Sequence, residues 1–403
     1  AVETGGALAF SYLNTRVTGP RLRVEGTLEL AADSVIAMQK MPSAKIWLAT
    51  ATGDLIDSGA AITAEIGSGP VRLLVEGRDL YALNLDWAAN PGKDVAAAFD
   101  ALTALSAAVR ARVGEGFLLP LVDRGAGGGK NSLWVKTVGS RARRDGDAEK
   151  TGHEDETLGL IVGCDKMLGA NLLVGGHAGY TCSEITTGNR AETTANQPFA
   201  GLYASYKAGR FYATADATAG TLDADTLRHE GGNRVTGSYQ ALALGAGAEI
   251  GAVLPLGKAA TLRPAAALHG MRYRFGHHME FAPAGEGALM LDDFTVNHVE
   301  SLAGVRFARA FRTPWALPGM VEVSAGWRRT LHDDDAPLGV TFASNETERA
   351  VIERAVYRRD RANLGAALRF ALRADMLASL AYDYEFASGS TRDTLAASFA
   401  WSW

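Results

Sequence analysis

The chain has 403 residues, of which 47% are hydrophobic and 21% are charged, and its formal net charge is -5. This length can hold two or three domains with a large core. The weakly acidic balance, with no strongly basic stretch, gives no support for a nucleic-acid partner. A composition of 46 glycines against 12 prolines favours tight strand turns and closely spaced backbones over a helical bundle.

Residues 1–90 are predicted to form short strands separated by turns rich in Gly, Ser and Asp. The segments AKIWLATATGDLIDSG (44–59) and PVRLLVEGRDLYALNLDW (70–87) show this texture most clearly. Their roughly even spacing favours the last coils of a parallel β-solenoid. A small antiparallel sandwich is the alternative structure for this region.

Residues 91–130 are predicted to contain one amphipathic helix and a flexible joint. Asp94 can cap a helix that runs from Asp94 to Arg112 and ends at Gly114 and Gly116. One apolar stripe at helical spacing supports this prediction: Val95, Phe99, Leu102, Leu105, Val109 and Val113. The joint VDRGAGGGKNS (122–132) resembles a phosphate loop only superficially, because Arg124 and Asn131 replace the required Gly and Ser or Thr.

Residues 131–403 are predicted to form about 12 antiparallel strands with alternating polar and apolar faces. FYATADATAG (211–220), QALALGAGAEI (240–250) and the final TLAASFAWSW (394–403) all follow a period of two. Short connections near 168–171, 208–210, 255–258 and 373–375 alternate with long hydrophilic ones near 184–197, 222–235, 275–293 and 332–352. Short turns at one end and long loops at the other are typical of a closed outer-membrane barrel.

The alternation also predicts which side chains face lipid and which face the lumen. Phe399, Trp401 and Trp403 share the apolar face of the last strand, where indole rings would lie at the membrane interface. The polar lumen candidates are expected to pair with one another, with water, or with Arg110 and Arg112 of the helix. They are Asp216, Glu249, Arg306, Arg328, Arg369, Asp383 and Glu385.

The two cysteines are predicted to be unpaired. Cys164 and Cys182 fall on the two strands of one predicted hairpin, at unequal distances from its turn near 168–171. A disulfide between them would therefore need distorted geometry. No apolar run of about 18 residues occurs, so no transmembrane helix is predicted.

In order and spacing, these segments resemble the type Va autotransporters, a family of type V secretion proteins. The resemblance covers essentially the whole chain and rests on SLWVKTVGS (132–140), SLAGVRF (301–307), VSAGWRRTL (323–331), SLAYDYEF (379–386) and the terminal Trp403. It implies a translocator β-barrel in the bacterial outer membrane at 131–403 and a linker whose helix threads the pore at 91–130. Residues 1–90 would be the C-terminal end of a β-helical passenger.

The resemblance also implies a function and a set of partners. The barrel would export or anchor its N-terminal passenger at the cell surface, as a monomer surrounded by outer-membrane lipid and lipopolysaccharide. Periplasmic chaperones and the barrel-assembly machinery would assist it, the latter recognising the last strand with Phe399, Trp401 and Trp403. Some members release the passenger through lumen acidic groups near a linker asparagine. Here only Asn90 lies just before the helix, so self-cleavage is not expected, and no catalytic residue or cofactor is assigned.

Metal binding and hydrolysis are the other chemistries that the sequence could suggest. His277, His278, Asp292, Asp293 and His298, and separately HDDDA (332–336), could suggest metal sites, but their spacing favours solvated loops. The alternative function is an outer-membrane barrel hydrolase or porin, for which His229, Glu230, His332 and Asp333 are available at the rim. A soluble all-β binding protein is a third interpretation. The helix before the first strand favours a translocator over a porin.

Removal of residues 399–403 is predicted to prevent the barrel from closing. After refolding into detergent, the full chain should give a faster-migrating, protease-resistant band on unheated gels, because a closed barrel resists unfolding by detergent. The truncated chain should lose this band. Folding of both chains in plain buffer would contradict the membrane interpretation.

Overall fold

The protein is described from a computed structural model. It describes residues 7–10, 22–24, 28–30, 35–38, 45–52, 55–57, 61–64, 71–76, 78–84, 90–118, 131–145, 152–187, 191–230, 233–282, 288–314, 317–334, 338–342, 345–352 and 359–403. The joint predicted at 122–132 lies outside these residues except for Asn131 and Ser132, which already belong to a strand.

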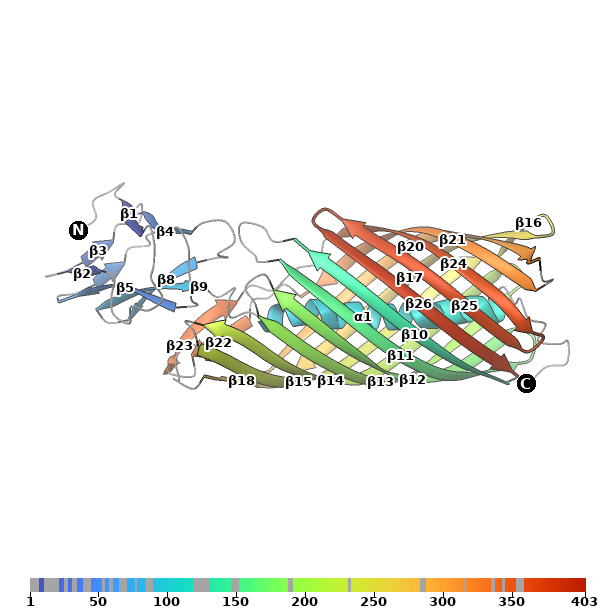
Figure 1. Ribbon diagram of the computed structural model, residues 1–403, viewed down its shortest axis with the longest axis horizontal. Helices are drawn as coiled ribbons and strands as arrows, with labels where there is room; N and C mark the ends of the chain where they lie inside the picture. Colours follow the sequence, from blue (N-terminus) through green and yellow to red (C-terminus); the bar gives the residue numbers. More distant parts are fainter. Residues whose placement is uncertain are drawn as a thin grey trace.

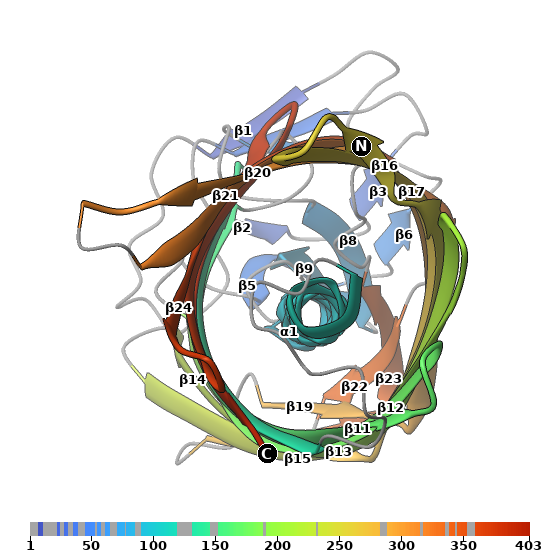
Figure 2. The same ribbon diagram turned by 90° about the vertical axis from the view of Figure 1, so that its right-hand side faces the viewer.

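Twelve long antiparallel strands close into a barrel, as predicted (Figures 1 and 2). They are β10 (Asn131–Arg144), β11 (His153–Leu168), β12 (Leu172–Thr187), β13 (Glu192–Ala208), β14 (Phe211–Glu230), β15 (Asn233–Ala252), β17 (Ala260–Phe275), β20 (Phe294–Arg312), β21 (Pro318–Asp333), β24 (Asp360–Arg373), β25 (Met376–Ala387) and β26 (Ser390–Ser402). The ring closes where β26 pairs with β10, from Ser132 opposite Ser402 to Arg144 opposite Ser390. Closure leaves no free sheet edge for lipid to meet.

The short turns lie where they were predicted. Three of them contain a glycine with positive φ, which only glycine adopts without strain: Gly169 (70°), Gly209 (60°) and Gly257 (73°). The register carries Cys164 opposite Gly176 and Cys182 opposite Leu158, so the two thiols are not neighbours and both are free.

In two of the expected long loops, the described residues belong almost entirely to strands. β12 runs to Thr187 and β13 starts at Glu192, while β14 and β15 remain paired as far as Glu230 opposite Asn233. For the described residues of 184–197 and 222–235 the prediction of loops was wrong, because these hydrophilic residues keep the period of two. A strand pair that is in water on both faces needs no apolar face. Twenty residues span about 65 Å of strand, or about 50 Å of height at the usual tilt, against an apolar band about 25 Å tall.

Short strands extend the same end of the wall still further. They are β18 (His278–Phe281), β19 (Leu289–Leu291), β22 (Leu338–Phe342) and β23 (Asn345–Ile352), with β16 (Leu254–Leu256) at the opposite end. β18 pairs with β15 and β19, β19 with β22, and β22 with β23. The rim is therefore uneven: β14 and β15 have 20 residues each, whereas β10, β24, β25 and β26 have 12 to 14 (Figure 1).

Side chains alternate between the outer surface and the lumen along each strand. In β14, Phe211 is 71% exposed while Tyr212 and Asp216 are buried inside. In the last strand Phe399, Trp401 and Trp403 point outward, as predicted. Trp401 packs against Trp403 and donates a 2.9 Å hydrogen bond from Nε1 to Asp375 Oδ2 at a short turn. In the part of the chain that is described, no helix combines the length and apolar character needed to cross a membrane.

A helix, α1 (Asn90–Val113), runs along the barrel axis inside the lumen (Figure 2). It starts four residues earlier than predicted, because Pro91 suits the first helical turn, so Asp94 lies inside the helix rather than capping it. It also does not end at Gly114. A π-helical segment, Gly114–Leu118, continues it because Glu115, Phe117 and Leu118 are held by the surrounding wall.

The N-terminal strands form small sheets, most of them parallel, beyond the end of the barrel with the taller rim (Figure 1). β1 (Ala7–Phe10), β4 (Val35–Met38) and β7 (Ala61–Ala64) pair in that order; β2 (Leu22–Val24) pairs with β5 (Lys45–Ala51), and β3 (Leu28–Leu30) with β6 (Leu55–Asp57). Each pairs with the element three places along the chain. The last hairpin, β8 (Val71–Glu76) and β9 (Asp79–Asn84), is antiparallel and adds to β5.

Several inward aromatic rings lie over glycines of adjacent strands. A Cβ added to Gly175 would come within 2.3 Å of the Tyr203 ring, and the pairs Gly163 with Trp134, Gly179 with Phe199 and Gly251 with Tyr212 are similarly tight. The glycines therefore make room for the rings that fill half of the lumen.

Gly175→Ala is predicted to destabilise the barrel by about 1–3 kcal/mol, because the new methyl group must displace the Tyr203 ring. The expected result is a lower temperature at which the folded band is lost on semi-native gels. Gly270→Ala is the matched control, since nothing lies within 4 Å of a Cβ at that strand position. Equal melting of the two variants would contradict the packing argument.

Candidate functional site

The lumen is divided into an apolar half and a charged half, with α1 between them. The helix packs against β11, β12, β13, β14 and β17. On this side, Phe99 meets Tyr273 edge to face at 5.2 Å between ring centroids, and Tyr273 Oη donates a 2.8 Å hydrogen bond to the carbonyl of Ala98. The stripe predicted from the sequence lies in this cluster with wall aromatics: Phe99, Leu102, Leu105, Val109 and Val113 are all buried.

Arg110 joins the helix to β14 and β15. Its Nη1 donates to Ser106 Oγ at 2.7 Å and lies 3.8 Å from Asp216 Oδ1, while its Nε lies 3.9 Å from Glu249 Oε2. Ser106 donates in turn to Asp216 Oδ2 at 2.9 Å. Asp216 and Glu249 are thus placed in the lumen beside a buried helix cation, which matches the face predicted for them.

Arg112 is bound by an aspartate that the sequence analysis missed. Its Nε donates to Asp165 Oδ2 at 2.8 Å and its Nη2 to Ser132 Oγ at 2.5 Å. Tyr203 Oη also donates to Asp165 Oδ2 and itself accepts from Trp134 Nε1, which fixes the carboxylate. The available signal was alternation: Asp165 shares the inward face of β11 with Ile161, a position that a solvent-exposed aspartate would not occupy.

A ladder of arginines and carboxylates crosses β20, β21, β24, β25 and β26. Glu385 lies 2.9 Å from Arg328 and 3.3 Å from Arg361, and Glu300 binds the same two arginines. Of these residues only Arg328 and Glu385 were predicted as lumen candidates. Glu300 and Arg361 were missed because their segments contain small residues that leave the strand face ambiguous by one position.

Arg369 binds a second pair of carboxylates, near the C-terminal end of the helix. It lies 3.2 Å from each carboxylate oxygen of Glu322, through Nη1 and Nη2, and 3.6 Å from Glu115 of the π-helical segment. Arg306 lies 3.8 Å from Glu249. The polar lumen therefore has its cations and carboxylates interleaved, which lets buried charges remain ionised.

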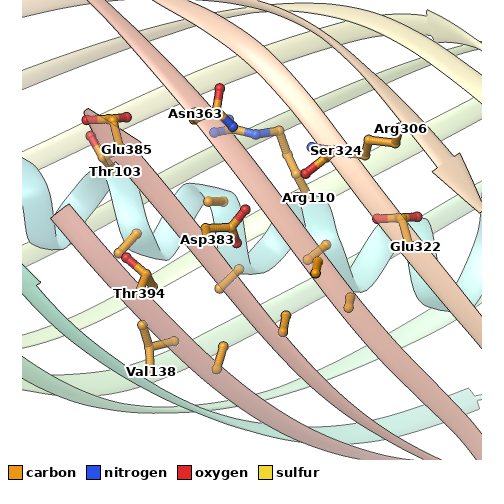
Figure 3. A pocket seen from close by; sticks show the side chains of 18 of the residues that line it. Thr103, Arg110, Val138, Arg306, Glu322, Ser324, Asn363, Asp383, Glu385 and Thr394 are labelled. Carbon is orange, nitrogen blue, oxygen red and sulfur yellow. The ribbon is translucent and has the colours of Figure 1, made fainter. Parts of the chain in front are cut away.

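The charged side of the lumen contains a cavity of about 140 Å³ between α1 and the wall formed by β17, β20, β21, β24, β25, β26 and β10 (Figure 3). Ala104, Ala107, Ala108 and Ala111 give the helix a thin surface there. Five of the predicted lumen residues line it: Arg306, Arg328, Arg369, Asp383 and Glu385. The volume is enough for several water molecules.

Comparison with known proteins identifies this architecture. Residues 133–384 match the family model of the autotransporter beta-domain. The chain belongs to this family. It is an outer-membrane translocator for passenger export, and such translocator domains are transporters rather than enzymes. The alternative of a barrel hydrolase or porin is not favoured.

Solved translocators share the fold. The translocator domain of the autotransporter NalP from Neisseria meningitidis matches at 15% identity with a TM-score of 0.56, covering 74% of this chain and 96% of that one. The beta domain of the Bordetella autotransporter BrkA matches at 18% identity with a TM-score of 0.51, covering 67% and 98%. No curated protein matches the sequence.

The described residues considered for metal or hydrolytic chemistry lie on different strands of the translocator or in the connections between them. The prediction of solvated loops was wrong for His278 and His298, which are buried on β18 and β20. His278 meets Tyr239 edge to face at 5.3 Å between ring centroids, and His298 lies 3.3 Å from Asp333. His229 lies on β14, while His332 and Asp333 are at the end of β21, with β15, β17 and β20 between. Among the described residues no group of three or more His, Cys, Asp or Glu could hold a metal ion.

Asp334, in HDDDA, is bound by protein donors. It accepts hydrogen bonds from the Asn297 backbone N and Nδ2 at 2.6 and 2.7 Å. Partial burial opposes ionisation, but these hydrogen bonds outweigh it and lower the pKa of the Asp334 carboxyl. These hydrogen bonds from Asn297 account for the position of the Asp334 carboxylate at the rim.

Asp165→Asn is predicted to destabilise the translocator by about 3–5 kcal/mol, because Arg112 stays buried without its counter-ion. The folded band should be lost at a lower temperature, and protease should cut the helix region of the refolded chain more readily. Asp223→Asn, on the outward face of β14, is the control. A variant as heat- and protease-resistant as wild type would show that the helix does not depend on this ion pair.

Proposed function

We propose that the chain works in three parts: residues 1–90 as the end of a passenger, 91–130 as a pore-threading linker, and 131–403 as the barrel that exports it. The observation that carries this proposal is the position of α1 in the closed barrel, between the N-terminal sheets at one end and the start of β10 at the other (Figure 1). The parallel strand pairs in residues 1–90 support a stacked-coil passenger.

The end of the barrel with short turns is taken to face the periplasm, and the tall rim the cell surface. Asn131 and Trp403 exchange backbone hydrogen bonds of 3.0 Å at the short-turn end, so the barrel begins and ends there. The helix must therefore cross the full lumen to connect β10 with residues at the surface. A pore of this size admits one helix or an extended chain but not a folded domain, so the passenger crosses unfolded.

We assign the polar lumen residues to seating the helix once export is complete. Asp216 and Glu249 bind Arg110, and Arg369 binds Glu115. The remaining candidates, Arg306, Arg328, Asp383 and Glu385, support the wall around the cavity and keep it wet. No catalytic residue, metal or cofactor is part of the proposal.

We further assign Phe399, Trp401 and Trp403 to recognition by the barrel-assembly machinery. Their outward orientation supports this, because the side chains are available to lipid or to another protein before the barrel is released. Periplasmic chaperones are the expected carriers of the unfolded barrel. In the membrane the translocator is proposed to be a monomer in contact with lipid and lipopolysaccharide.

Export can be tested with an epitope placed before residue 1 of a chain directed to the periplasm of a Gram-negative host. Antibody should label the epitope on intact cells, because the linker carries the N-terminal region to the tall-rim end. The matched control carries the same epitope directly before Asn131, at the short-turn end, and should be labelled only after the outer membrane is permeabilised. Equal labelling of both folded proteins, or of neither, would reject the proposal.

A further inference from the structure

The junction of β10 and β26, here called the seam, is the joint at which the barrel closes. Neighbouring long strands elsewhere follow one another in the chain, whereas β10 and β26 are its first and last barrel strands. The seam therefore depends on ladder hydrogen bonds and side-chain contacts alone. Any group inside the lumen that binds both strands would strengthen it.

At the surface end of the seam, one helix carboxylate binds both strands. Asp100 lies 2.5 Å from Nη2 of Arg144 on β10 and 2.8 Å from Nη1 of Arg392 on β26. Its side chain is 4% exposed. Arg392 faces Ala142 across the seam, so the two guanidinium groups are diagonal neighbours on the inner face. A shared carboxylate removes their mutual repulsion.

Both arginines also pair with the strand next to their own on the side away from the seam. Asp155 of β11 lies 3.6 Å from Arg144, whose Nη1 is also 2.9 Å from His153. Glu385 of β25 lies 3.1 Å from Arg392. Each of these contacts joins an arginine to the strand beside its own, away from the seam. Asp100 differs because it pairs with both arginines.

The periplasmic end has a second attachment, divided between two helix residues. Arg112 donates to Ser132 of β10, which also accepts a 3.3 Å hydrogen bond from Ser402 of β26. Glu115 accepts from Ser379 of β25 at 3.0 Å and from Ser398 of β26 at 3.5 Å. Both seam strands are again bound to the helix.

The two attachments are separated by the cavity. Asp100 and Glu115 are about 22 Å apart along the helix, close to the height of the apolar band. Between them, most of the helix side chains that line the cavity are alanines. Contact with the seam side is thus concentrated at the two ends of α1.

We propose that the linker helix fastens the barrel seam from inside, with Asp100 as the group that bridges the first and last strands. This role adds to filling the pore, and it rests on the contacts of α1 rather than on passenger export. A barrel whose lumen holds no helix has Arg144 and Arg392 side by side without the shared carboxylate. Arrival of the helix therefore completes closure of the wall.

Hydrogen exchange of the full chain, folded in detergent and followed by mass spectrometry, tests the proposal. Asp100→Asn should speed amide exchange in peptides covering 141–144 and 390–394 by roughly tenfold or more, because a buried ion bridge is broken. Asp216→Asn is the matched control. It removes a carboxylate that also binds the helix, but on β14, and it should leave seam exchange as in wild type.

Two outcomes would overturn the proposal: wild-type exchange at the seam in Asp100→Asn, or equal acceleration at the seam in Asp216→Asn. If Asp100→Asn does not fold, Arg392→Gln and Arg144→Gln replace it. Each should open the seam, and the double variant should open it no further than the more affected single one, because the bridge needs both arms. Additive effects would mean that the arginines act separately and would reject the bridge.

Discussion

The structure depends on one constraint: a strand placed in lipid must have every backbone hydrogen bond satisfied by another strand. Closure of β26 on β10 meets that constraint, and the remaining features follow from the closed ring. A ring of twelve strands encloses more space than its own side chains fill. A helix from the preceding segment occupies the surplus, so the barrel and the linker complete one another.

The lumen accommodates that helix asymmetrically. On one side, large rings such as Tyr203 and Tyr273 press on the apolar stripe of α1, and glycines beneath the rings make room for them. On the other side, charged side chains line the barrel wall, and a cavity remains between this wall and the helix. Apolar packing fixes where the helix lies, and a few ion pairs fix how far along the axis it sits. The helix is therefore packed tightly on its apolar side, while the charged side of the lumen keeps space for water.

Much of this was predictable because alternation is local. The period of two in FYATADATAG and TLAASFAWSW gave the faces of β14 and β26, and the glycine turns gave the strand ends on one side. Strand ends on the other side were not predictable, since a hydrophilic ribbon and a hydrophilic loop have the same composition. Asp165 was missed although alternation was an available signal, and Glu300 was missed because small residues leave the face of its strand ambiguous. The partners of Asp165, Glu300 and Asp100 were not predictable, because only the closed barrel with its helix brings Arg112, Arg361 or Arg144 beside them.

The uneven rim gives the barrel a direction. Strands β14 and β15 rise well above the membrane, while the strands around the seam are the shortest in the ring (Figure 1). The rim at this end of the barrel is therefore oblique, and it is lowest at the junction of β10 and β26. A polypeptide that leaves this end of the barrel therefore has the longer wall on its β14 and β15 side and the shorter wall on its seam side.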